Sequence, residues 1–201
     1  MKIVSWIRIC AQGAWLNGRH IHLPEGEWAE EAYRQAGTNY PKFFKMDRMC
    51  QAGWMASELL LREDSDRFVP RDDRAVILLS HAGCLCNDLH YQNTIQDSEN
   101  YFPSPALFVY TLSNILTGEI AIRNKYLGET SCYLLPKWDA TALLELSNHA
   151  LQDATTRSLL TGWVDCMPDQ SDDILLCLVT ADGGMAWNEE NIKQLYEYGR
   201  I

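Results

Sequence analysis

Apolar and polar residues alternate along the chain in blocks that predict short strands separated by helices. Residues 2–10 are apolar and partly β-branched, which is typical of a strand, and residues 75–80 form a fully apolar run of strand length. A run of this kind indicates a strand that is covered on both faces. Three further strands are expected at residues 131–135, 159–164 and 174–180.

The segments between these strands have helical composition or helical spacing of apolar residues. Residues 106–127 are expected to form one long, buried helix that ends near Gly128. The residues around Gly13 and Gly18 are expected to break the first strand, and the charged residues 63–74 and the polar residues from 81 onward are expected to be loops. The other predicted helices cover residues 27–36 before Gly37, residues 48–62 after the N-cap Asp47, residues 140–153 after the N-cap Asp139, and residues 188–198.

This alternation predicts an α/β fold with a sheet covered by helices. The last two strands are separated only by the acidic turn at residues 169–173, so we expect them to be antiparallel and the sheet to be mixed. Residues 1–201 are expected to form a single domain, because this length suits one domain or one half of a larger two-part fold.

Composition and charge narrow the classes of function. The chain is 47% apolar, enough for a substantial core, and its formal net charge is -10. Nucleic acid and anionic membranes are therefore unfavourable partners. An acidic carrier protein would need a local basic patch, for which the candidates are Lys42, Lys45 and Arg48, or Arg123 and Lys125. The alternative interpretation of these groups is a solvated surface.

The cysteines indicate the redox compartment. There are seven of them, an odd number, and most lie among apolar neighbours. We therefore expect reduced thiols in the cytoplasm, not a disulfide framework. The N-terminus has no features of a signal peptide, and no uninterrupted apolar stretch reaches the roughly 20 residues of a membrane helix.

The most informative motif lies in a segment that begins with Pro103 and Pro105. Asn114 and Gly118 follow within it, and a helix would place them one turn apart on the same face. A glycine there would permit close approach of a neighbouring element, and the asparagine amide would tie a crossing backbone. This segment resembles the β-ketoacyl synthase stretch in which a proline-led helix carries an Asn and then a Gly one turn later.

Two flanking segments are similar to the same family. Residues 45–49 are similar to a helix start of these synthases, and residues 159–165 resemble the strand that follows their nucleophile helix. The resemblance runs with gaps from residue 1 to about residue 181. It implies the N-terminal half of a thiolase-like fold, and it is nearest to short ketosynthase-like or chain-length-factor proteins of aryl-polyene and flexirubin-type pigment pathways.

The catalytic residues that this resemblance implies are missing. The family places its cysteine nucleophile at the start of the helix that follows the strand after the Gly128-like position. Lys137 and Trp138 occupy that stretch, and none of the five histidines lies in a Gly-rich motif of the family. The resemblance therefore implies a non-catalytic subunit without a cofactor, which assists fatty acid, polyketide or polyene assembly. Its expected partner is an active ketosynthase or a second copy, with an acyl carrier protein as a further partner. The family pairs two such strands across a dimer axis, and the equivalent strand is at residues 131–135.

Two alternative sites remain open in the sequence. Cys132 is a candidate nucleophile for an acyl-thioester transferase or hydrolase that uses a histidine, although a strand position also suits a core cysteine. Zinc ligands are concentrated in a second segment, but its C-x-C spacing is tighter than usual for zinc, so we expect no metal. The candidate ligands are His81, Cys84, Cys86 and His90.

Overall fold

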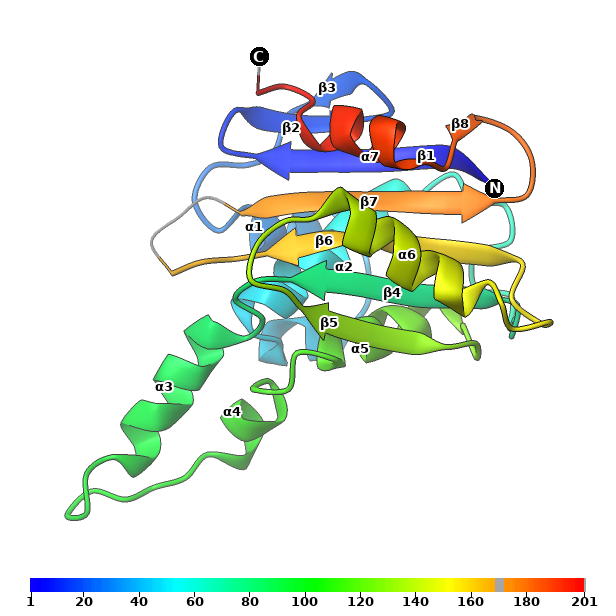
Figure 1. Ribbon diagram of the computed structural model, residues 1–201. Coiled ribbons are helices and arrows are strands. Elements are labelled where there is room, and N and C mark those ends of the chain that lie inside the picture. Colours follow the sequence, from blue (N-terminus) through cyan, green and yellow to red (C-terminus); the bar gives the residue numbers. More distant parts are fainter. Residues whose placement is uncertain (169–171, 201) are drawn as a thin grey trace.

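Eight strands form one mixed sheet in the computed structural model, which describes residues 1–168 and 172–200. The strands are β1 (Lys2–Cys10), β2 (Gly13–Leu16), β3 (Arg19–Ile21), β4 (Arg74–Ser80), β5 (Thr130–Leu134), β6 (Ser158–Asp165), β7 (Asp173–Thr180) and β8 (Met185–Ala186). Their order is β3-β2-β1-β7-β6-β4-β5, and β8 pairs with β1. Strand β5 therefore forms one edge of the sheet (Figure 1).

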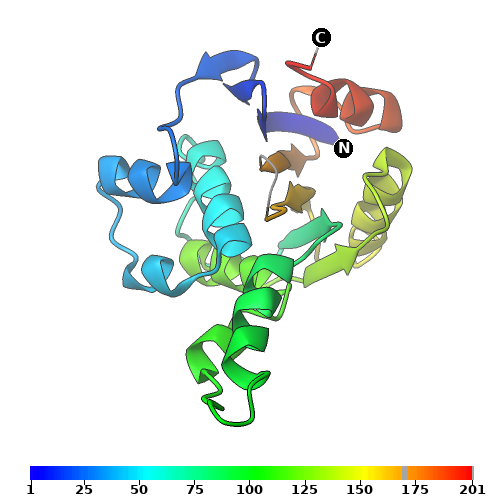
Figure 2. The same cartoon turned by 90° about the vertical axis from the view of Figure 1, so that its left-hand side faces the viewer.

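The helices cover both faces of this sheet. They are α1 (Trp28–Ala36), the 3₁₀ helix η1 (Pro41–Lys45), α2 (Arg48–Leu60), α3 (Leu85–Ile95), α4 (Pro105–Val109), α5 (Ile115–Asn124), α6 (Ala140–Ala150) and α7 (Glu189–Tyr196). Helices α1, α2 and α5 lie on one face and α6 and α7 on the other, while α3 and α4 project from the body (Figure 2). No helix of the described residues is long and apolar enough to cross a membrane.

The centre of the sheet follows the predicted pattern. Strand β4 is buried at every residue, and it pairs in parallel with both β5 and β6. Strands β6 and β7 form the expected antiparallel pair. The expected fold class, a mixed sheet covered by helices, is confirmed. The sheet is covered on both faces because its central strands are apolar on both sides, and such strands are buried only between two layers of helices.

Helix boundaries agree with the capping residues in the sequence. Helix α1 ends at Gly37, which has a left-handed conformation with a φ of 61°. The Asp47 side chain accepts hydrogen bonds from the backbone N–H groups of Met49 and Cys50 at the start of α2. Asp139 does the same for Thr141 and Ala142 at the start of α6. Each cap satisfies N–H groups that have no partner within the helix.

Three expectations for local structure are incomplete or wrong. The first strand does end at Cys10, but the residues around Gly13 and Gly18 then form β2 and β3, a hairpin whose turn is Asn17-Gly18. Both turn residues have positive φ, which is the conformation that an Asn-Gly pair favours in hairpins. The segment after β4, expected to be a loop, contains α3, whose only buried residue is Asn87. A helix with so little buried surface has no apolar periodicity to reveal it.

The third error concerns the long helix expected at residues 106–127. The segment is divided into α4, which has no buried residues, and α5, which has a buried face. Between them, Thr111 donates its hydroxyl to the Phe108 carbonyl oxygen, a local hydrogen bond of the kind that competes with continuation of a helix. Helix α5 is thus the buried part of the motif-bearing segment, and it packs against α2.

A buried arginine attaches the last helix to the sheet. The Arg8 side chain lies on β1, wholly buried, and donates from Nε to the Tyr196 carbonyl oxygen at 2.7 Å. Its Nη1 lies 2.6 Å from Asp173 Oδ1, and Tyr196 donates its own hydroxyl to the same carboxylate. A buried charge is tolerated only with such partners. The network fixes Tyr196 at the amino end of β7.

Two glycines of the family motif have opposite surroundings, and this generates a stability prediction. A Cβ on Gly128 would lie 2.6 Å from the Arg74 carbonyl oxygen, whereas a Cβ on Gly118 would meet nothing within 4 Å. We expect Gly128→Ala to lower the free energy of unfolding by about 2 kcal/mol through a backbone clash. Gly118→Ala should raise it by about 0.5–1 kcal/mol, because alanine is the better helix former.

Urea denaturation of the two variants measures both effects. A destabilised Gly118→Ala variant would contradict the finding that this position faces open space within the chain.

Candidate functional site

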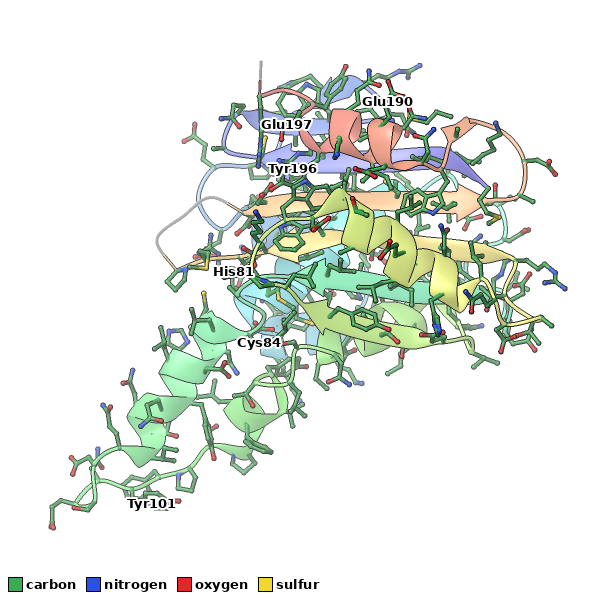
Figure 3. The ribbon with its side chains drawn as sticks, in the orientation of Figure 1. His81, Cys84, Tyr101, Glu190, Tyr196 and Glu197 are labelled. Carbon is green, nitrogen blue, oxygen red and sulfur yellow. The ribbon has the colours of Figure 1, made fainter. Side chains whose placement is uncertain are left out.

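The carboxyl ends of three parallel strands define the candidate site. Strands β4, β5 and β6 run in the same direction, so the segments that follow Ser80, Leu134 and Asp165 meet at one edge of the sheet. Sites in α/β proteins are usually built from loops at this edge. Figure 3 shows His81 and Cys84 at this junction, with Tyr196 on the neighbouring helix α7.

The stretch between β5 and α6 is the one in which the resemblance led us to expect the nucleophile. Trp138 fills it: the indole stacks on the Tyr196 ring with centroids 3.9 Å apart and planes 11° apart. The Trp163 ring packs edge-on against Trp138 with centroids 5.7 Å apart. Lys137 is exposed to solvent. The space at the start of α6 is therefore occupied by aromatic side chains of three separate elements.

A carboxylate connects the loops at this edge. Asp165 Oδ1 accepts hydrogen bonds from the Ser80 hydroxyl at 3.0 Å and from the backbone N–H groups of His81 at 3.0 Å and Ala82 at 2.8 Å. His81 donates from Nδ1 to the Leu135 carbonyl oxygen at 3.1 Å. The loop after β4 is thereby held to the end of β6 and to the loop after β5. The imidazole has a positioning role in this arrangement.

The sequence-based reasoning did not single out Asp165 or Ser80. Each is the last residue of an apolar strand, and this strand-end position was the only signal available in the sequence.

Thiols are concentrated at the same edge, and all seven cysteines of the chain are free. Burial raises the pKa of Cys132 to about 11 and is the only cause of that shift. Burial also raises the pKa of Cys84 to about 12 and, less strongly, that of Cys86. In the described part of the chain, no histidine or carboxylate forms a hydrogen bond or ion pair with Cys132. The environment of Cys132 is therefore that of a core thiol, and it disfavours a thiolate nucleophile.

Besides burial, the carboxyl group of Asp47 acts electrostatically on the thiols of Cys50 and Cys84 and raises the pKa of both. It caps α2 and accepts from Cys50 N at 3.2 Å and from Met49 N at 3.3 Å. Burial nevertheless dominates and raises the pKa of Asp47 to about 6. The carboxyl group is thus partly protonated just below neutral pH.

The candidate metal ligands do not converge. His81 is engaged by Leu135, the Cys86 thiol donates to the Cys166 carbonyl oxygen at 3.3 Å, and His90 is exposed on α3. Cys84 is buried at the N-terminus of α3. Among residues 1–168 and 172–200, no group of three or more His, Cys, Asp or Glu side chains is arranged to hold a metal ion.

The motif residues of the ketosynthase resemblance lie along α5 and the chain that leads into β5, and Ser113, the residue before Asn114, forms a side-chain hydrogen bond with Cys84. Asn114 is exposed at the start of α5 and its amide forms no hydrogen bond within the described residues, so the expected tie to a crossing backbone is absent. The close approach expected at Gly118 is also absent, whereas Gly128 does contact the backbone of residues 72–74. Of these three residues, only Gly128 packs closely against another segment of the chain.

The candidate basic patches are largely neutralised. Lys42 lies 3.7 Å from Glu119, Arg48 pairs with Asp172 at 2.8 Å, and Arg123 pairs with Glu58. Lys45 and Lys125 are exposed and form no ion pair within the described residues. The two candidate patches thus retain two separated lysines without an ion pair, which is a weak electrostatic footprint for an acidic partner.

Comparison with known proteins identifies the architecture. No protein-family model matches the sequence, and no curated protein matches it. Solved structures do match: a chain of the ishigamide ketosynthase/chain length factor superposes with a TM-score of 0.61 at 16% identity, covering 89% of this chain and 61% of that one. The chain has a ketosynthase-like fold. This is the thiolase-like fold that the resemblance implied.

Two further structures have the same fold. A chain of the ketosynthase ApeO in complex with its chain length factor ApeC, from Xenorhabdus doucetiae, matches with a TM-score of 0.60 and 13% identity, over 100% of this chain and 92% of that one. A β-ketoacyl synthase from Burkholderia phymatum STM815 matches with a TM-score of 0.60 and 10% identity, over 90% of this chain and 59% of that one. The ketosynthase-like chain thus spans about three fifths of two of these structures and nearly all of the third.

The raised pKa of Asp47 predicts a pH-dependent stability. A carboxyl group with a pKa near 3.8 in the unfolded chain and about 6 in the folded protein binds its proton more tightly when folded. Its contribution to stability is therefore greatest below pH 3.8 and is lost as the pH rises to about 6. Asp47→Asn retains the cap without the charge, so at pH 7 we expect it to raise the free energy of unfolding, by an amount on the order of 2–3 kcal/mol.

Denaturant unfolding of both proteins between pH 4 and pH 8 measures this difference. The stability difference should grow across the window from pH 4 to pH 6 and stay constant above it. A difference that is the same at every pH would show that Asp47 titrates normally.

The high pKa of Cys132 predicts that the isolated protein forms no acyl-enzyme. At neutral pH only roughly one in ten thousand Cys132 side chains would be a thiolate. Incubation with an acyl thioester, followed by intact-mass spectrometry, should show no stoichiometric adduct, whereas the same reagent should modify the denatured chain at its cysteines. A stoichiometric adduct on the folded protein that disappears in Cys132→Ser would promote the transferase or hydrolase alternative.

Proposed function

We propose that this protein is a non-catalytic, ketosynthase-like subunit that assists acyl-chain assembly by pairing with an active ketosynthase. The observation that carries the proposal is the Trp138–Tyr196 stack, because it fills the start of α6, where a ketosynthase would hold its nucleophile. This aromatic stack leaves no room for an acyl group at that position. A role in the reaction would therefore have to come through a partner.

The open edge of the sheet supports pairing as the means of action. The backbone of Leu135 donates to Ser80 O, and that of Val76 donates to Glu129 O, so residues 129, 131, 133 and 135 direct their backbone groups toward β4. By alternation, Thr130, Cys132 and Leu134 direct theirs toward the open edge. Leu134 is also 57% exposed. An unpaired edge with apolar side chains is a template for strand addition.

The structural relatives supply the chemical context. They include a ketosynthase/chain length factor pair, a ketosynthase in complex with its chain length factor, and a type II polyketide ketosynthase complex that contains an acyl carrier protein. By analogy, the partner of this chain is a ketosynthase, and the product class is a fatty acid, a polyketide or an aryl polyene pigment. An acyl carrier protein would then reach the complex mainly through the ketosynthase, since this chain is strongly acidic.

The alternative of an acyl-thioester transferase or hydrolase that uses Cys132 lacks a supporting contact. Burial raises the pKa of this thiol, and it has no imidazole partner among the described residues. The Trp138–Tyr196 stack at the start of α6 also does not involve Cys132. We therefore retain the non-catalytic subunit as the proposal.

Strand pairing predicts the effect of a proline at the sheet edge. Leu134→Pro removes an N–H that faces the open edge and leaves the hydrogen bonds to β4 intact. In co-expression with the ketosynthases of its source organism, the tagged wild-type protein should retain one of them on an affinity column. Leu134→Pro should weaken that complex by about tenfold or more, as expected for a lost ladder contact within a stable interface.

Leu134→Ala is the matched control, because it shortens the side chain and keeps the backbone donor. Circular dichroism melting establishes that both variants are folded. Equal binding of the proline variant and wild type would contradict pairing through β5, and failure of every ketosynthase to bind wild type would refute the proposed function.

A further inference from the structure

A pocket lies between the β2–β3 hairpin and the start of α1. Its volume is about 380 Å³. The floor is a row of three apolar residues, Ile9 on β1, Ala14 on β2 and Ile21 on β3, which share one face of the sheet because they are paired across the strands. Helix α2 packs on β1 and β7, whereas the hairpin lies beyond the helices (Figure 2). The hairpin end of this row therefore borders the pocket.

One end of the pocket carries a charge pair that is already neutralised. Arg48 donates from Nη2 to Asp172 Oδ1 at 2.8 Å, and the Trp28 indole donates from Nε1 to Asp172 Oδ2 at 2.7 Å. Both oxygens of this carboxylate, whose side chain is 7% exposed, are thus engaged. Glu25 and Glu27, exposed beside the lining, would repel an anion, and a cation would have to compete with Arg48 for Asp172. The charges therefore favour an uncharged ligand.

The hairpin side of the pocket supplies hydrogen-bonding groups. The Cys10 thiol donates to Gln12 Oε1 at 3.1 Å, and no described residue accepts from the amide Nε2 of Gln12. Gln12 is exposed, so this amide can donate to an oxygen atom of a ligand. The imidazoles of His20 and His22 line the same pocket and are also exposed. A ligand therefore meets an apolar floor and a polar rim, which is the usual composition of a small-molecule site.

The size of the pocket and its aromatic wall favour a rigid ring system. Trp28 lines the pocket, and aromatic rings attract one another more strongly than their buried area alone would give. A cavity of about 150 Å³ holds benzene, so this larger volume suits two fused rings. A rigid ligand also loses less conformational freedom on binding than a flexible chain. We propose that the pocket binds a small, uncharged aromatic molecule whose hydroxyl or carbonyl oxygen accepts a hydrogen bond from Gln12.

Titration of the ¹⁵N-labelled full chain with 2-naphthol tests this site by NMR. The Trp28 indole N–H signal, assigned by its loss in Trp28→Phe, should shift and saturate with a dissociation constant of about 1 mM or below. The anion 2-naphthoate has the same two rings and adds a negative charge. It should bind about tenfold more weakly or not at all, because no positive charge in the pocket is left to pair with it.

Two variants locate the binding in this pocket. Ala14→Leu fills the floor and should raise the dissociation constant about tenfold or more. Gln12→Ala removes the donor and should raise it about threefold. Ala14 is buried, so circular dichroism melting establishes that its variant is folded, whereas the exposed Gln12 provides a test that does not touch the core. Ala106→Leu is the matched control, because it makes the same change at an exposed alanine of α4 outside the pocket and should leave the constant unchanged.

Three results would overturn the inference. One is the absence of a saturable shift of the Trp28 signal at about 4 mM 2-naphthol. The second is an unchanged dissociation constant in Gln12→Ala and in folded Ala14→Leu, and the third is binding of 2-naphthoate as tight as that of 2-naphthol. None of these measurements involves a ketosynthase, so the inference and the proposed function stand or fall separately.

Discussion

The parallel pairing of β4 with both β5 and β6 is the constraint on which the rest of the structure depends. Because β4 is buried along its whole length, its neighbours cannot shift register without exposing apolar side chains. The pairing therefore fixes three chain segments at one edge, which Asp165 then joins by accepting hydrogen bonds from Ser80, His81 and Ala82. It also leaves β5 as the outer strand.

Aromatic side chains occupy the site at that edge, between the end of β5 and the start of α6. A helix N-terminus follows β5, as the chemistry of an activated thiolate would require. Trp138 stands before that helix and is held by Tyr196, which the buried Arg8 and Asp173 anchor from behind. The last helix thus takes part in closing the site. Its apolar residues pack on the sheet, and its outward residues, among them Glu190 and Glu197 in Figure 3, are polar and exposed.

The sequence predicted what depends on local pattern. The buried strand β4, the Asp47 and Asp139 caps and the antiparallel β6–β7 pair all followed from apolar runs, capping residues and a short connection. Helix α3 was not predictable, because a helix with almost no buried face leaves no apolar periodicity. The Asn17-Gly18 turn was a signal that was present and was read only as a break.

The candidate site was predicted less well than the fold. Lys137 and Trp138 pointed to a lost nucleophile, but the partners of Trp138 come from residues 163 and 196, a contact that only tertiary packing creates. The roles inferred for Asn114 and Gly118 failed for the same reason, since the expected crossing element does not approach them. Residue spacing along a helix fixes a face, and the neighbours of that face depend on the whole fold.

The central claim is that this chain changes a ketosynthase's reaction without carrying out chemistry itself. The most direct measurement is the product distribution of the partner ketosynthase, supplied with malonyl and acyl carrier-protein substrates, with and without this protein. The account predicts condensation or a defined chain length only when both proteins are present, with every covalent acyl group on the ketosynthase. Identical rates and product lengths in both reactions, or an acyl group attached to this chain, would contradict it.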